Sequence, residues 1–259
     1  MEKYDMVMRP DEPYYARQYL HWILPELSSR YDNRKIQILD LGCGQGRLSL
    51  PLAGWCASGG GRVTGIDFVS SAIEKARGYA AQRSLSNVTF EQNDLLDFIQ
   101  KKADGSADAI LLIEVTFILP SYREVLAEIF RVLRPKGLAF IAFRSQYYNL
   151  LHTIRGRNWD GAKMALEQWE GHLFGGSSWF SWQTPEEIHQ LMDESGLHLL
   201  DLRGIGISSG IEGDPLVAIA RPSELSPKEQ ENLMKIECTL AEHYAACCRY
   251  ILATAEKSL

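Results

Sequence analysis

The chain has 259 residues and is 46 % hydrophobic, which is enough to fill the core of one large α/β domain. Its net charge of −6 argues against a nucleic-acid-binding surface, because such surfaces gather Lys and Arg to neutralise phosphates. No apolar run approaches the roughly 20 residues of a membrane span, and the polar segment 1–12 is unlike a signal peptide. We therefore expect a cytoplasmic protein without a membrane span.

The cysteines predict no metal centre. There are five of them, and none has the paired spacing of a zinc site. Reduced, mostly buried thiols are the expectation, and binding of a soft metalloid by the adjacent Cys247 and Cys248 is the alternative.

An N-terminal helix is the first element that the sequence predicts. Aromatic residues recur with helical spacing after Pro13, at Tyr14, Tyr15, Tyr19 and Trp22. Such a helix either forms a lid over a ligand site or packs its aromatic side chains on a sheet.

Strands and helices then alternate five times, which is the pattern of a doubly wound parallel sheet. Branched aliphatic residues mark the strands, which we expect at 35–41, 62–67, 88–91, 109–113 and 138–143. Helices are expected at 47–55, at 71–83 and after Ser121. The Ser/Thr-x-x-Glu pattern predicts capping boxes at Ser71, Ser121, Thr184 and Ser226.

Aromatic residues become more frequent after the fifth strand. Eight of the 36 residues in 147–182 are aromatic, about twice the chain average of 10 %, which predicts an inserted helical subdomain. A helix from Thr184 and strands at 197–207 and 216–220 then complete a seven-stranded sheet. The last helix carries an apolar stripe that runs to Ile251 and must face the domain or a second subunit.

The most informative stretch is the glycine turn that follows the first strand. Gly42, Gly44 and Gly46 come directly after a buried run, so a ligand can approach the backbone closely. The dinucleotide fingerprint needs its third glycine at position 47, where this chain has Arg47. Asp40 would repel a diphosphate, but it could accept a hydrogen bond from an ammonium group. The turn therefore predicts a cationic ligand without phosphate.

Three more acidic residues follow expected strands. Asp67, Asp94 and Glu114 come at or after the ends of the second, third and fourth strands. Ligands of doubly wound sheets lie beyond the carboxyl ends of the strands. These side chains are therefore expected at the same sheet edge as Asp40.

These segments together resemble the class I S-adenosylmethionine-dependent methyltransferases. The resemblance rests on four motifs in family order, at 39–47, 63–67, 93–95 and 131–137, and it covers about residues 35–145. It implies a Rossmann-like fold with a doubly wound, mostly parallel seven-stranded sheet. An N-terminal helical lid and a helical insert after the fifth strand complete that expectation, with S-adenosylmethionine as the methyl donor.

The resemblance also implies roles for single residues. The glycine turn backs the methionine part of the cofactor, Asp67 accepts from both ribose hydroxyls, and Phe68 lies against the adenine. Asp94 takes the adenine amino group, and the Leu95 amide contacts the ring. The full expected set is Asp40, Gly42, Cys43, Gly44, Gly46, Asp67, Phe68, Asp94, Leu95 and Glu114.

The expected domain organisation is one methyltransferase domain over 1–259. Its parts are N-terminal lid helices at 1–34, a cofactor-binding core at 35–145, an aromatic-rich helical insert at 146–183 that caps the acceptor, a final helix and strands at 184–222, and a C-terminal helix at 223–259.

Methyl transfer from a sulfonium is an in-line displacement, in which the protein mainly aligns the reactants and excludes water. A general base is needed only if the acceptor atom starts protonated. The insert offers His152, His172, Tyr147 and Glu170, and no spacing singles out one of them, so the catalytic residue is left unassigned. Many family members carry a Glu-His pair where this chain has Phe117-Ile118, and no catalytic role is transferred to that segment.

The aromatic insert predicts a roof over an acceptor pocket, so a small apolar or aromatic acceptor is the leading hypothesis. The glycine-rich segment 175–178 could let part of that roof move. One alternative is a methyltransferase for protein or RNA, and basic residues around the insert keep RNA open: Arg144, Arg155, Arg157 and Lys163. Another is a non-catalytic cofactor-binding or assembly protein whose last helix forms a homodimer interface.

Overall fold

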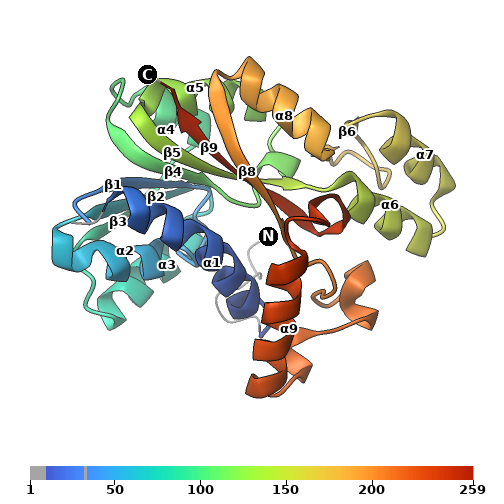
Figure 1. Ribbon diagram of the computed structural model, residues 1–259. Coiled ribbons are helices and arrows are strands. Elements are labelled where there is room, and N and C mark those ends of the chain that lie inside the picture. Colours follow the sequence, from blue (N-terminus) through green and yellow to red (C-terminus); the bar gives the residue numbers. More distant parts are fainter. Residues whose placement is uncertain (1–9, 32–33, 259) are drawn as a thin grey trace.

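The structure, a computed structural model, describes residues 10–31 and 34–258 and centres on one seven-stranded sheet. The strand order is β3-β2-β1-β4-β5-β9-β8 (Figure 1). β1 to β5 pair in parallel, whereas β9 runs antiparallel to both β5 and β8. The expected doubly wound, mostly parallel sheet is confirmed. Its strands are β1 Gln37–Leu41, β2 Arg62–Asp67, β3 Val88–Gln92, β4 Ala107–Leu112, β5 Leu133–Arg144, β8 Leu197–Ile205 and β9 Tyr250–Lys257.

Helices cover both faces of this sheet (Figure 1). Consecutive strand residues point to opposite faces, so Ile110 packs beneath α4, α5 and α8, while Leu111 packs beneath α1 and α2. The first layer contains α4 Leu95–Gln100, α5 Tyr122–Val132 and α8 Pro185–Glu194, and the second contains α1 Glu12–Arg30, α2 Ser49–Cys56 and α3 Ser70–Gln82.

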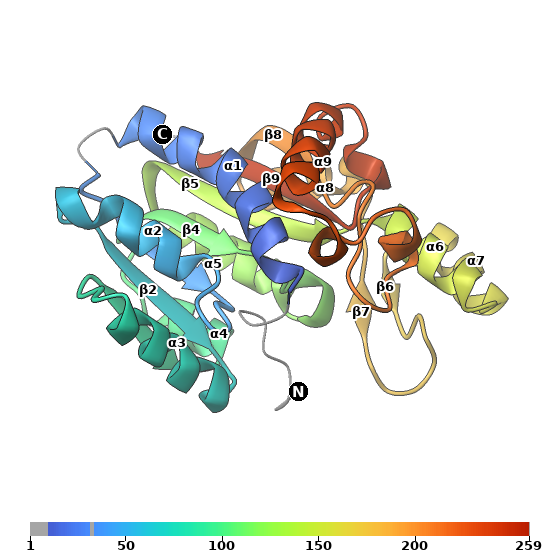
Figure 2. The same cartoon turned by 90° about the horizontal axis from the view of Figure 1, so that it is seen from below.

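The segment between β5 and α8 extends away from the sheet (Figure 2). It contains α6 Gln146–Arg155, α7 Trp159–Glu167 and a short hairpin of β6 Glu170–Gly171 and β7 Phe180–Ser181. Trp182 is fully buried in a small core with Ala165 and Leu173, whereas Trp159 and Trp169 are largely exposed. The aromatic side chains of the insert are therefore divided between its own core and its surface.

The expected strand at 216–220 and the expected length of the last helix were wrong. Pro215–Ala218 is a 3-10 turn (η3), because Pro215 and the Asp214 side chain, which accepts from the Leu216 amide, start a helical turn. α9 Pro227–Leu240 ends ten residues before β9, which supplies the seventh strand. The misreading arose because β9 is buried between β5 and β8, and its apolar residues continue the helical stripe by coincidence.

The expected apolar stripe of the last helix, which was to face the domain or a second subunit, packs on the domain only in part, through Leu233. Ile236 and Tyr244 are about half exposed, and the buried residue of α9 is Glu237. Glu237 accepts hydrogen bonds from the Tyr14 hydroxyl at 2.8 Å and from the Ser208 amide at 2.8 Å. A buried carboxylate therefore joins α9 to α1.

Two of the four predicted capping boxes form. Thr184 and Ser226 each accept from the backbone three residues on, and the glutamate there accepts in return. α3 begins one residue early with Val69 as its N-cap, and Ser121 makes no side-chain cap bond. The Ser/Thr-x-x-Glu pattern therefore predicts where a helix starts better than it predicts which capping hydrogen bonds form.

α1 packs three tyrosines and two aliphatic side chains on the sheet, as the packing alternative predicted: Tyr14, Tyr15, Tyr19, Ile23 and Leu27. The expected lid at 1–34 includes residues 1–9 and 32–33, which lie outside the described residues. Within the described ranges, no helix is long and apolar enough to cross a membrane.

Candidate cofactor and acceptor site

The glycine turn is fixed to the end of β2. Gly42, Gly44 and Gly46 have φ angles of 77°, 54° and 83°, a region that L side chains rarely adopt. The amides of Gly42 and Cys43 both donate to the Ile66 carbonyl at 2.8 Å. The turn therefore has a fixed shape next to the sheet edge.

Asp67, the last residue of β2, binds this turn directly. One carboxylate oxygen accepts from the Gly44 amide at 2.8 Å, and the other accepts from the Val69 amide at 2.9 Å. The side chain remains partly exposed, and the next residue, Phe68, is 73 % exposed. A carboxylate that can accept hydrogen bonds and an exposed aromatic ring therefore lie next to each other at the entrance of the site.

A cavity of about 860 Å³ lies between the glycine turn and the segment after β4. This volume is within the range of small-molecule sites. Nine of the ten residues expected at the cofactor line it, and Gly46 instead faces Phe90 and Leu50. Residues to which the sequence assigned no role at the cofactor complete the lining: Gln45, Arg47, Leu48, Val69, Ala72, Ile113, Val115, Ile118 and Leu119.

Asp40, in β1 just before the turn, lines the cavity and is almost fully buried. Burial raises the pKa of Asp40 to about 6, against the opposing effects of the Ser49 hydroxyl and Arg47. A nearby cation would favour the carboxylate form. The buried carboxyl is therefore suited to an ammonium group.

Asp94 caps α4 while facing the cavity. Its Oδ1 accepts from the Leu96 amide at 2.9 Å and from the Asp97 amide at 3.1 Å. Asp94 therefore serves as the N-cap of α4 and also lines the cavity.

Arg47 connects the cavity wall to α1. Its guanidinium pairs with Glu12, the first residue of α1, and with Glu114 at 3.2 Å. Burial alone would raise the pKa of Glu114, but Arg47, Arg249 and Arg144 outweigh it and hold that pKa below its usual value. The arginine that breaks the dinucleotide fingerprint thus organises the site, and its place in the glycine motif was the available signal.

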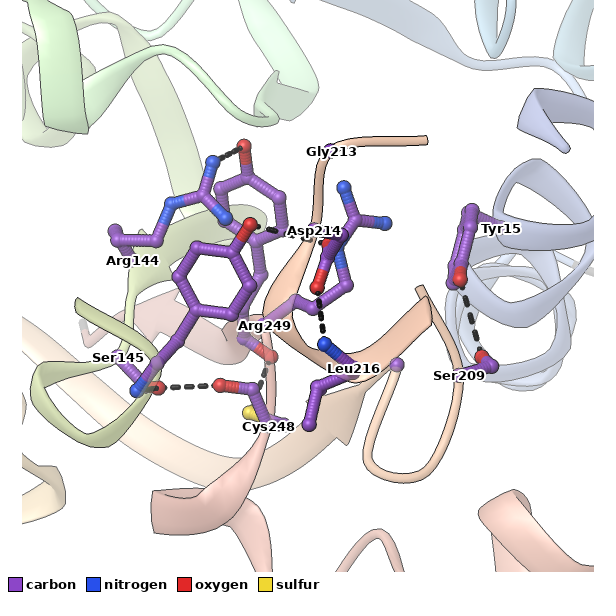
Figure 3. Close-up of polar contacts among 12 residues, drawn as sticks. Tyr15, Arg144, Ser145, Ser209, Gly213, Asp214, Leu216, Cys248 and Arg249 are labelled. Carbon is purple, nitrogen blue, oxygen red and sulfur yellow. Dashed lines mark hydrogen bonds and ion pairs between the residues drawn. The ribbon is translucent and has the colours of Figure 1, made fainter. Parts of the chain in front are cut away.

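A second set of buried polar residues includes Arg144, Asp214 and Arg249 (Figure 3) together with Tyr148 and Tyr250, and we call these five residues the polar cluster. The Arg249 Nε lies 2.6 Å from the Asp214 carboxylate, which also accepts from the Tyr148 hydroxyl at 3.1 Å. The Arg144 Nη2 donates to the Tyr250 hydroxyl. The cluster comes from three distant segments of the chain, and the sequence indicated Arg144 only as a charge near the insert.

None of the expected base candidates is among the residues that line the cavity. Tyr147 lines a separate groove of about 750 Å³, and exposed His172 lies with its Nδ1 3.1 Å from the Ser178 carbonyl oxygen. His152 packs 4.8 Å from the Phe174 ring, and burial lowers its pKa. In the described part of the chain, no group of His, Cys, Asp and Glu is arranged to hold a metal ion.

Comparison with known proteins gives the family. A family model described as a methyltransferase domain matches residues 32–196. A ubiquinone biosynthesis O-methyltransferase of Rickettsia felis is 30 % identical over 189 residues, which cover 72 % of this chain and 70 % of the relative. A sterol 24-C-methyltransferase of Gibberella zeae is 32 % identical over 130 residues, or 49 % of this chain and 32 % of the relative.

A solved structure with a similar fold is the magnesium protoporphyrin IX methyltransferase of Synechocystis PCC 6803 with bound SAH. It has a TM-score of 0.59 and 16 % identity, and the match covers 99 % of this chain and 89 % of that one. The sequence motifs, the strand order and the family match agree. The chain therefore belongs to the methyltransferase-domain family, and it is a class I methyltransferase that uses S-adenosylmethionine.

Proposed function

We propose that the protein transfers a methyl group from S-adenosylmethionine to a small, apolar or aromatic acceptor by in-line displacement. The cofactor supplies the methyl group already activated on a sulfonium. The protein then has to bind both reactants, align them and exclude water. One observation carries the proposal: the cavity has a polar end at the glycine turn and an apolar end after β4.

The polar end suits the cofactor. Asp67 would hold the ribose hydroxyls and Phe68 would cover the adenine, because a partly exposed carboxylate and an exposed ring stand side by side. Asp94 and Leu95 would contact the adenine edge. Asp40 would accept from the ammonium of the methionine part, for which its burial and charge are suited.

The apolar end suits the acceptor. Ile113, Val115, Ile118 and Leu119 line it, and such walls hold hydrophobic molecules through burial of apolar surface. Two relatives are named for ubiquinone biosynthesis and for sterols, which supports an apolar acceptor. Their names include an O- and a C-methyltransferase, so the proposal covers an oxygen or a carbon as the methylated atom.

The test follows an isotopically labelled methyl group from S-adenosylmethionine into separate fractions of a cell extract. We expect the label in small organic molecules, with formation of S-adenosylhomocysteine, and its absence with an Asp67→Ala variant. Label in RNA or protein would favour those acceptors instead. Cofactor binding without any labelled product would favour a non-catalytic role.

A further inference from the structure

Arg144 differs from the other two buried arginines near the site. Arg47 pairs with Glu12 and Glu114, and Arg249 pairs with Asp214. Arg144 is only 8 % exposed, and its buried Nη1 has no hydrogen-bond partner among the described residues. Its Nη2 bonds to a neutral hydroxyl, so the contacts of this guanidinium include no carboxylate from the described part of the chain.

Aromatic rings surround this cation. The guanidinium carbon lies 4.6 Å, 4.4 Å and 3.8 Å from the ring centroids of Phe117, Tyr148 and Tyr250. Cation–π contacts offset part of the cost of burying a charge, but they leave the in-plane N–H donors unsatisfied. A buried donor without an acceptor is costly, and a ligand oxygen would remove that cost.

Arg144 also lies at the sheet edge that carries the cavity, although it is not among the residues that line it. It ends β5 at the sheet edge where Glu114 and the 3-10 turn η2 Thr116–Ile118 follow β4. The Thr116 hydroxyl donates to the Ala142 carbonyl at 2.9 Å and holds η2 against β5. Phe117, whose ring centroid lies 4.6 Å from the guanidinium carbon, directly precedes Ile118 of the apolar end of the cavity.

We propose that Arg144 binds a carboxylate group of the acceptor, an inference that rests on the proposed function. A carboxylate oxygen would accept from Nη1 in a charge-assisted hydrogen bond, and it would give a direct ionic contact to the one of these three guanidinium groups that contacts no carboxylate of the described residues. Arg47 contacts both Glu12 and Glu114, so the three arginines and the three carboxylates balance in number, and the charge of Arg144 lowers the pKa of Glu114 without contacting it. A carboxylate would add one net negative charge to this group and a dianionic phosphate would add two, so we assign a carboxylate. The aromatic rings would pack on the body of the acceptor.

Binding must move a ring aside, because Nη1 is closed off from solvent. Tyr148 belongs to α6 of the insert, whereas Tyr250 and Phe117 belong to β9 and η2 of the central sheet region. α6 is therefore the element whose shift would open access to the guanidinium.

Calorimetry on the protein saturated with S-adenosylhomocysteine tests the assignment. The probes are benzoate, 4-hydroxybenzoate and 3-phenylpropionate, each compared with its neutral amide, together with phenyl phosphate. We expect at least one acid to bind about tenfold more tightly than its amide, and Arg144→Gln to remove that preference. Arg144→Lys should keep part of it. Arg157→Gln, which removes an exposed charge of the insert, should leave it unchanged.

Three results would overturn the assignment: equal binding of every acid and its amide, tighter binding of phenyl phosphate, or weaker binding of S-adenosylhomocysteine by Arg144→Gln. The last would place Arg144 at the cofactor. If Arg144→Gln does not fold, the acid-to-amide ratio of Arg144→Lys decides. Failure of the wild type to form S-adenosylhomocysteine from labelled donor would instead contradict the proposed function.

Discussion

Removing Arg249 should destabilise the protein far more than removing Arg144, although both arginines are buried in the polar cluster. Arg249→Met leaves the Asp214 carboxylate in a site that is 2 % exposed, with the Tyr148 hydroxyl and the Leu216 amide as its remaining donors. Breaking one side of a buried pair costs about 3 to 5 kcal/mol, and the remaining bonds favour the lower figure. For a chain of this size, about 3 kcal/mol lowers the Tm by about 6 to 12 °C.

Arg144→Met is the matched control. It separates no ion pair, and the lost donor to Tyr250 is offset by removal of the unsatisfied Nη1, so the change should stay within about 1 kcal/mol. Differential scanning calorimetry of both variants measures the difference. Adding Asp214→Asn to Arg249→Met should restore part of the lost stability. Equal destabilisation by the two methionine variants would refute the reasoning, because Arg144 would then hold the fold together.

Three further outcomes are expected. Asp67→Ala should weaken binding of S-adenosylmethionine by about tenfold to a hundredfold or more in calorimetry while circular dichroism stays unchanged, since charge-assisted hydrogen bonds are lost; unaltered affinity would contradict the ribose assignment. Asp40 has a raised pKa of about 6, so the ligand-free folded form binds more protons than the unfolded chain between about pH 4 and about pH 6, and its stability should fall as pH rises through that window. In urea unfolding, the free energy of unfolding of the wild type should decrease by about 2 to 3 kcal/mol between about pH 4 and about pH 6, and Asp40→Asn should abolish this decrease. The same pH dependence in the wild type and in Asp40→Asn would argue against a raised pKa of Asp40. Gly42→Ala should cost about 1 to 3 kcal/mol because its Cβ would lie 2.3 Å from Val115 Cγ2 at φ 77°, whereas Gly54→Ala, in open space on α2, should be neutral or stabilising by up to about 1 kcal/mol.

Strands β1, β2, β4 and β5 could be predicted because each contains buried apolar residues bounded by a turn signal, whereas β3, an edge strand in which only Phe90 is buried, was marked by its β-branched and aromatic residues. Such local patterns also indicated the glycine turn and the acidic strand ends, and nine of the ten expected cofactor residues line one cavity. β9 could not be separated from the helix before it, because its neighbours β5 and β8 decide its structure. The residues of β9 are compatible with a strand, but only their pairing with β5 and β8 makes them one.

The polar cluster could not be predicted for a related reason. Arg144, Asp214 and Arg249 are far apart in sequence, and each is an ordinary charged residue in its local context. The antiparallel pairing of β5 with β9 brings Arg144 opposite Tyr250, and the ion pair with Arg249 joins Asp214 from the start of η3 to them. When the fold brings together residues from distant segments, no spacing in the sequence marks the site that they form.

The ion network Glu12–Arg47–Glu114 makes the docking of α1 and the occupancy of the cavity thermodynamically linked. A ligand that contacts the Glu114 side of this network would strengthen the attachment of α1, and an attached α1 would strengthen ligand binding by the same free energy. Amide hydrogen exchange in the first turn of α1 should therefore slow when S-adenosylhomocysteine binds. Disrupting the contact with Glu12→Gln should reduce that protection and the affinity by equal factors, so that the beginning of α1 reports on cofactor binding without touching it.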